Sequence, residues 1–96
     1  MNKALGLIEV LGLTTAMAAL DAALKAADVQ FLGCEKVIGV GKAIALTVRF
    51  EGDVASVQSA LDAAKVAAER IGKVFVARVI ARPDVELNRL WSRCQN

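Results

Sequence analysis

The amino-acid sequence predicts one α+β domain, in which an antiparallel sheet carries two helices on one of its faces. Three observations support this fold class. The 96 residues are enough for a single domain. Short apolar runs with the period of a strand alternate with longer alanine-rich segments with the period of a helix. Gly39 and Gly41 flank a single valine, a pattern typical of a tight turn between two antiparallel strands.

The expected elements follow from these periods. Apolar or alternating runs predict four strands, over Ala4–Val10, Val29–Ile38, Lys42–Glu51 and Val74–Ala81. Two amphipathic segments between these strands predict helices. The first spans Thr15–Ala27, with Thr14 or Thr15 as its N-cap, and the second spans Val54–Ile71, with Asp53 as its N-cap. A short terminal helix is expected over Asp84–Ser92, with apolar side chains for docking at Val85, Leu87, Leu90 and Trp91. The order β-α-β-β-α-β is the split, ferredoxin-like arrangement, whose second sheet face is left to a partner or to solvent.

The segment 42–51 is the most regular of the expected strands. Its larger apolar side chains alternate with smaller or charged ones, so one face should carry Ile44, Leu46, Val48 and Phe50. Cys34, in the apolar strand before it, is expected to be a small packed side chain. Cys34 and Cys94 are far apart and form no C-x-x-C pair, so the sequence supports neither a metal site nor a redox site.

The composition indicates where this protein makes its contacts. The chain is 56% hydrophobic, and a small domain cannot bury that much apolar surface in its own core. No apolar run is long enough to span a membrane, so we expect the surplus to lie in a subunit interface. The net charge of +2, scattered along the chain, does not favour nucleic acid. Glu9 interrupts the N-terminal apolar run, so an export signal is not expected and the protein should be cytoplasmic.

The residue inventory argues against an enzyme. The chain contains no histidine and no tyrosine, which removes the common nucleophile-base pairs and the commonest metal ligand, and we expect no cofactor. The string Gly39-Val40-Gly41-Lys42 is similar to a phosphate loop only in outline. Its glycine spacing is too short, Ala43 stands where a hydroxyl residue is needed, and a strand rather than a helix is expected to follow.

Four strings, in order along the chain, resemble the bacterial microcompartment shell proteins of the type with one BMC domain that forms hexamers. They are ALGLIEVLGLTTAMAALDAALKAADVQFLG, EKVIGVGK, GDVASVQSALDAAKVAAERIG and VIARPDVEL. The resemblance runs from about Ala4 to Leu87. It predicts one domain over residues 1–96, with a core over residues 4–87 and a C-terminal helix and tail over residues 84–96.

The resemblance implies a structural role. Members of this family form homo-hexameric tiles that pack, together with related shell proteins, into a flat sheet around encapsulated enzymes. The loop between the second and third strands lines a central pore, which here implies a pore-lining set of Gly39, Val40, Gly41 and Lys42. The contacts between neighbouring hexamers imply an edge set of Lys25 and Arg82, with Asp21 and Pro83 from the same two strings. The pore should pass small polar or anionic metabolites, because loop amides and Lys42 favour negative charge.

This sequence also departs from the family pattern. One extra residue precedes Gly39, and the stretch from Gly41 to Gly52 is about three residues longer than usual, which predicts an extended hairpin or a bulge near Arg49–Glu51. Asp84 replaces the usual histidine after the Arg-Pro pair. A second function class stays open: a small-metabolite-binding regulatory domain, since ferredoxin-like domains of this size commonly bind ligands between subunits.

Overall fold

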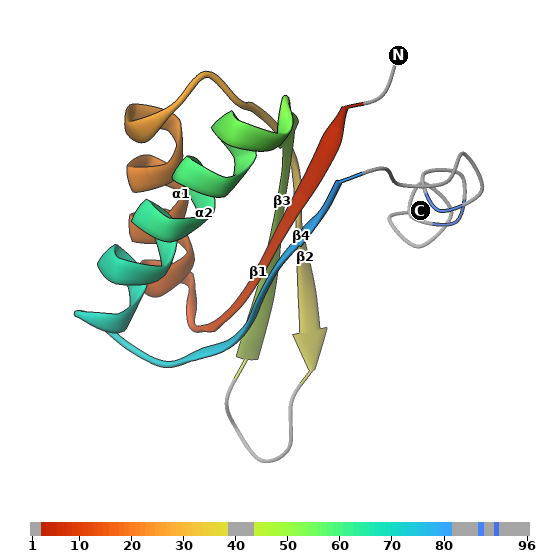
Figure 1. Cartoon of the computed structure of the whole chain (residues 1–96). Helices are drawn as coiled ribbons and strands as arrows, with labels where there is room; N and C mark the ends of the chain where they lie inside the picture. The colour runs from red at the N-terminus through yellow and green to blue at the C-terminus, as the bar shows by residue number, and fades with distance from the viewer. Residues whose placement is uncertain (1–2, 39–43, 82–86, 88–89, 91–96) are drawn as a thin grey trace.

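The structure, a computed structural model, describes residues 3–38, 44–81, 87 and 90. Its elements are, in order, β1 (Ala4–Leu11), α1 (Leu13–Ala26), β2 (Gln30–Ile38), β3 (Ile44–Gly52), α2 (Val54–Glu69) and β4 (Val74–Ile80). The strands form one antiparallel sheet in the order β2-β3-β1-β4. Both helices lie on one side of that sheet (Figure 1). The predicted α+β fold and its β-α-β-β-α-β order are therefore confirmed.

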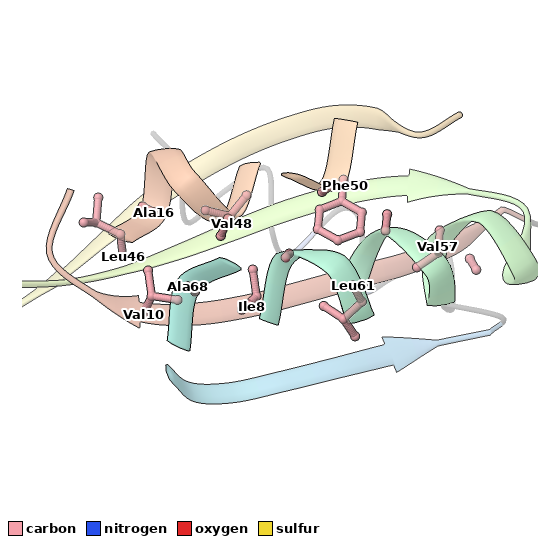
Figure 2. Packing of buried hydrophobic residues seen from close by; sticks show 14 residues of the cluster. Ile8, Val10, Ala16, Leu46, Val48, Phe50, Val57, Leu61 and Ala68 are labelled. Atoms are coloured by element: carbon pink, nitrogen blue, oxygen red, sulfur yellow. The ribbon is translucent and has the colours of Figure 1, made fainter. Parts of the chain in front are cut away.

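The hydrophobic core lies between the helices and the two central strands (Figure 2). Alternate residues of the central strands point toward the helices, and the buried ones include Ile8, Val10, Leu46, Val48 and Phe50. The alternation predicted for β3 is thus correct for three of its four apolar positions. It is wrong for Ile44, which is 46% exposed because it is the first residue of the strand and lies at the margin of the core.

Small side chains line the contact between the two helices and the rest of the core. The buried alanines recur every three or four residues, at Ala16, Ala19 and Ala23 of α1 and at Ala60, Ala64 and Ala68 of α2. An alanine has no side chain beyond Cβ, so two helices that meet through alanines can approach closely. The alanines of the helical segments therefore allow close packing, in addition to favouring helix formation.

The two helices begin in different ways. α2 begins as predicted, because the Asp53 carboxylate accepts a hydrogen bond from the Ser56 backbone N at 2.8 Å. α1 begins at Leu13 after Gly12, which has φ 87° and no side-chain cap, so the predicted threonine cap is wrong. A residue with a side chain rarely adopts that φ, and Thr15 is buried within the helix. The sharp turn out of β1 thus moves the helix start ahead of both threonines.

The Asp53 cap should make stability depend on pH in the acid range. Hydrogen bonds from Ser56 lower the pKa of the Asp53 carboxyl below its ordinary value of 3.8. The contribution of the carboxylate is therefore present above that value and is lost as the pH falls through the lowered pKa. We expect Asp53→Ala to lower the urea midpoint at neutral pH and the difference from the parent to shrink at acid pH. Asp53→Asn is the control, because an asparagine can cap the helix but does not titrate. If the difference in urea midpoint between the parent and Asp53→Ala did not change with pH, the expectation would be contradicted.

One irregularity distinguishes the edge strand β2. The pairing of β2 with β3 shifts between Phe31 and Gly33, so Phe31 lies opposite Phe50 and Cys34 lies opposite Val48. The bulge predicted near Arg49–Glu51 is not in that segment: β3 pairs with β1 without interruption, and the extra residue, Leu32, belongs to β2 across from Phe50 and Arg49. Cys34 is exposed, and its predicted packing is wrong, because an edge strand extends beyond the cover of the helices.

Two findings complete the fold. Leu87 and Leu90 have helical backbone, as expected for the terminal segment; the other residues of Asp84–Ser92 lie outside the described part of the chain. Among the helices that the structure describes, none is both long and apolar enough to cross a membrane.

Candidate functional site

The β2–β3 connection and the end of α1 lie at opposite ends of the sheet. At the hairpin end, where β2 passes into β3, β1 also ends and β4 begins. At the far end, β1 begins, β3 and β4 end, and α1 ends before β2 begins (Figure 1). The antiparallel pairing forces this separation, because each strand and each helix reverses the direction of the element before it. Of the predicted edge residues, Lys25 lies in the last turn of α1, toward the far end.

Lys25 and Asp21 form an exposed pair on α1. The Lys25 Nζ lies 3.0 Å from the Asp21 Oδ2, one helical turn away, and the two side chains are 76% and 63% exposed. An exposed pair of this kind contributes only about 0.3–0.5 kcal/mol to folding. Lys25 also lies in the last turn of α1, where a positive charge is favoured by the helix dipole. Both groups are therefore held in place but open to another molecule.

Arg82 and Pro83, the other predicted edge residues, lie outside the described residues. β4 ends at Ile80, which pairs with Leu5 at the far end. The end of β4 thus lies at the same end of the sheet as the end of α1.

The predicted hairpin is confirmed by the pairing that flanks it. Ile38 and Ile44 are the last pair between β2 and β3, and residues 39–43 connect them. Gly39, Val40, Gly41 and Lys42 themselves lie outside the described residues. Because β3 follows this turn directly, the arrangement of a phosphate loop, which needs a helix there, is absent.

A polar pocket at the far end was not predicted. It has a volume of about 270 Å³ and is lined by Lys3, Asp28, Val29, Gln30, Glu51, Gly52 and Asp53. The Lys3 Nζ lies 3.9 Å from the Glu51 Oε1 across its wall. These residues come from the start of β1, the α1–β2 connection and the β3–α2 connection, so no local motif in the sequence could have revealed the pocket.

The sheet face away from the helices carries several polar groups. The Thr47 hydroxyl donates a hydrogen bond to the Glu9 Oε1 at 3.5 Å, between paired residues of β3 and β1. Arg49 is only 6% exposed, and burial lowers the pKa of its guanidinium while nearby Glu51 opposes that shift. An arginine keeps its proton in proteins, so this face holds a largely buried positive charge.

The cysteine and the acidic side chains of the described residues are the groups that could take part in chemistry. Partial desolvation and the charge of Glu35 raise the pKa of the exposed Cys34 thiol, which leaves less of the nucleophilic thiolate at neutral pH. No group of three histidine, cysteine, aspartate or glutamate side chains in the described part of the chain could hold a metal ion. The described part of the chain is thus an α+β domain whose exposed groups offer surfaces for contact.

Comparison with known proteins agrees with that class. Residues 4–83 match the model of the family described as the BMC domain. The chain belongs to this family of bacterial microcompartment shell proteins.

Two relatives and one solved structure illustrate the similarity. The microcompartment shell protein PduA of Citrobacter freundii is 42% identical over 89 residues, which are 93% of this chain and 91% of PduA. The shell protein EutK of Escherichia coli is 48% identical over 84 residues, which are 88% of this chain but 48% of EutK. A microcompartment protein from Desulfitobacterium hafniense has a crystal structure that matches with a TM-score of 0.76 at 30% identity, over 91% of this chain and 45% of that one. None of these three proteins bears the name of an enzyme.

Proposed function

We propose that this chain is a tile of a bacterial microcompartment shell in the bacterial cytoplasm. Six copies form a ring with their hairpin ends at the central axis and their far ends at the rim, and rings pack side by side into a sheet that encloses enzymes. The observation that carries the proposal is the separation of the β2–β3 connection from the end of α1. A ring tile needs its pore-lining groups and its lateral contacts at opposite ends of the subunit, and the strand order puts that connection and the end of α1 at opposite ends.

The two edges of the sheet support a closed ring. β2 and β4 are the edge strands, and both expose apolar side chains. The exposed fractions are 40% for Phe31 and Val37 on β2, and 43% and 42% for Phe75 and Val76 on β4. A head-to-tail contact between two different edges closes into a ring when it is repeated with the right rotation. Such a contact would also remove the unpaired strand edges from solvent.

The exposed face of α1 adds further apolar surface. Leu13, Met17 and Leu24 are 64%, 56% and 45% exposed, and their spacing puts them on one side of the helix. Complete burial of a side chain of this size in a subunit contact would stabilise the contact by about 1.5–3 kcal/mol. Part of the surplus of apolar residues found in the composition thus lies at the edges of the sheet and on α1, where subunit contacts would cover it.

Replacing Lys25 with alanine tests the lateral contact. We expect the parent protein to form hexamers in dilute solution, and sheets or tubes at high concentration by electron microscopy. Lys25→Ala should keep the hexamer, because the lysine lies at the rim, but should lose the sheets. The mass of the particles in solution and electron micrographs at matched concentrations measure the two effects separately.

Lys65→Ala is the matched control, because Lys65 is also an exposed lysine on a helix and belongs to neither predicted set. It should leave both hexamers and sheets unchanged. Equal sheet formation by the parent and Lys25→Ala would contradict the assignment of Lys25. A discrete dimer, trimer or tetramer whose melting temperature rises with a small metabolite would favour the regulatory domain instead.

A further inference from the structure

The two edge strands carry opposite charges on the sheet face away from the helices. Residues that pair directly across two strands share a face of the sheet. Arg78 of the edge strand β4 pairs with Leu7 of β1, and Glu35 of the edge strand β2 pairs with Thr47 of β3. Leu7 and Thr47 each precede a core residue in their strand, so both face away from the helices. This face therefore ends in a cation at one edge and in an anion at the other.

Both charged groups are accessible to a second molecule. The Arg78 side chain is exposed, and its Nη1 donates a hydrogen bond to the Ala77 carbonyl oxygen at 3.0 Å. A guanidinium has several N–H donors in a planar fork, so this bond leaves donors for a carboxylate. Glu35 is partly exposed and belongs to an edge that has no neighbouring strand within the described residues. The two groups can therefore meet only if two copies of the chain come together, since β1 and β3 separate the two edges of one sheet.

The residues on either side of this charged pair fit the same register. The two edges present three positions each on this face: Val76, Arg78 and Ile80 on β4, and Val37, Glu35 and Gly33 on β2. β2 and β4 run in opposite directions, and with all hairpin ends inward β4 of one copy passes β2 of the next in antiparallel order. If Arg78 lies opposite Glu35, then Val76 lies opposite Val37 and Ile80 lies opposite Gly33. The two valines, 42% and 40% exposed, would cover each other, and the glycine would leave room for the isoleucine.

A register shifted by two residues is less favourable. It would put Arg78 opposite Gly33, which pairs with Arg49 in its own sheet, and Glu35 opposite Val76. The cation would then approach the largely buried positive charge of Arg49, and the carboxylate would face an apolar side chain. Charge and side-chain size therefore select the same register.

We propose that Arg78 of each copy pairs with Glu35 of the next copy around the ring, and that this pair sets the direction and register of the subunit contact. The inference rests on the proposed function, because it requires that copies of the chain form rings. An edge that met its own counterpart would bring two arginines or two glutamates together, which disfavours a two-fold dimer. Contact between unlike edges is head-to-tail, and repeated contacts of this kind can close into a ring.

Charge reversal of the two residues tests the pair. Arg78→Glu makes both edges acidic and Glu35→Arg makes both edges basic, so each variant alone should form rings poorly. We expect the concentration at which half of the rings dissociate to rise by about tenfold or more for each variant. Mixing the two variants in equal amounts should restore the rings, because every contact in an alternating ring then joins a glutamate to an arginine. Native mass spectrometry should find equal numbers of the two variants in each ring.

Lys65→Glu is the matched control, because it reverses an exposed positive charge on α2, away from both edges, and should leave the rings unchanged. Circular dichroism of each variant checks that the fold remains. Rings that persist unchanged in both single variants, or that fail to return on mixing, would overturn the pairing while leaving the ring of the parent in place. A parent protein that forms no rings would overturn the proposed function and the pairing together. The parent alone therefore tells the two failures apart.

Discussion

Replacing Phe50 with alanine is expected to lower the free energy of unfolding by about 3–5 kcal/mol. Phe50 is 0% exposed and is the largest of the fully buried side chains. It lies at the centre of the core between β3 and α2, near Leu61 and Val57 (Figure 2). The substitution leaves a cavity that the surrounding strands and helices can fill only in part. Urea denaturation followed by far-ultraviolet circular dichroism measures the loss.

Phe31→Ala provides the comparison. Phe31 pairs with Phe50 on the neighbouring strand but is 40% exposed. Phe31→Ala should therefore lower the free energy of unfolding by clearly less than Phe50→Ala. Equal losses for the two variants would mean that the core is not centred on Phe50. Any rise in oligomer dissociation with Phe31→Ala is a separate effect, because this side chain also belongs to the exposed edge of β2.

Gly6 explains why the ring of Phe50 fits at this position. Gly6 and Phe50 are paired residues of β1 and β3, and a Cβ added to Gly6 would lie 2.5 Å from the Phe50 Cε2. The aromatic ring thus occupies space that any other residue at position 6 would take. A methyl group there would force the ring to move, a cost of about 1–3 kcal/mol in a well-packed core. The glycine in an otherwise apolar strand is a packing partner of the phenylalanine.

Most of the fold could be predicted from sequence periodicity. The strict alternation of residues 44–50 specifies which side of β3 faces the core, and the alanine-rich segments have the period of helices. Asp53 was a reliable cap because its effect is local: an aspartate and the backbone N of Ser56 lie three residues apart in the chain. Features that depend on neighbouring residues are encoded locally and can be predicted from local patterns.

The features that escaped prediction depend on which strands become neighbours. The exposure of Cys34 follows from the edge position of β2, and the bulge between Phe31 and Gly33 is defined only by its pairing with β3. The far-end pocket combines residues from three separate parts of the chain. For the same reason, the burial of Leu5 and Arg49 on the sheet face away from the helices was not predicted. Of the predicted site residues, only Lys25 and Asp21 lie in the described part of the chain, and the roles of both sets stay predictions.

The charges of the two ends bear on what the proposed pore would admit. At the hairpin end, the described charged groups are Lys36, Arg70 and Lys73 against Glu9, Glu35 and Glu69, since Glu9 and Glu35 both pair with Thr47. The pocket at the far end has Asp28, Glu51 and Asp53 against Lys3. In a ring with hairpin ends inward, every charge at that end would be repeated around the axis, so one further positive charge per subunit would give a field that attracts anions. Lys42, which follows Gly41 in the sequence, is the candidate for that charge.

Replacing Lys42 with glutamate should therefore reverse the preference of the pore for anions. We expect reconstituted shells of the parent to admit a small anion faster than a cation of similar size, and shells of Lys42→Glu to show the opposite order. Raising the salt concentration should weaken both preferences, because screening shortens the reach of the charges. Lys3→Glu makes the same charge change at the far end and should leave the order of the parent intact. Unchanged anion flux in Lys42→Glu shells, with hexamers and sheets still formed, would mean that the pore does not select by the charge of this loop.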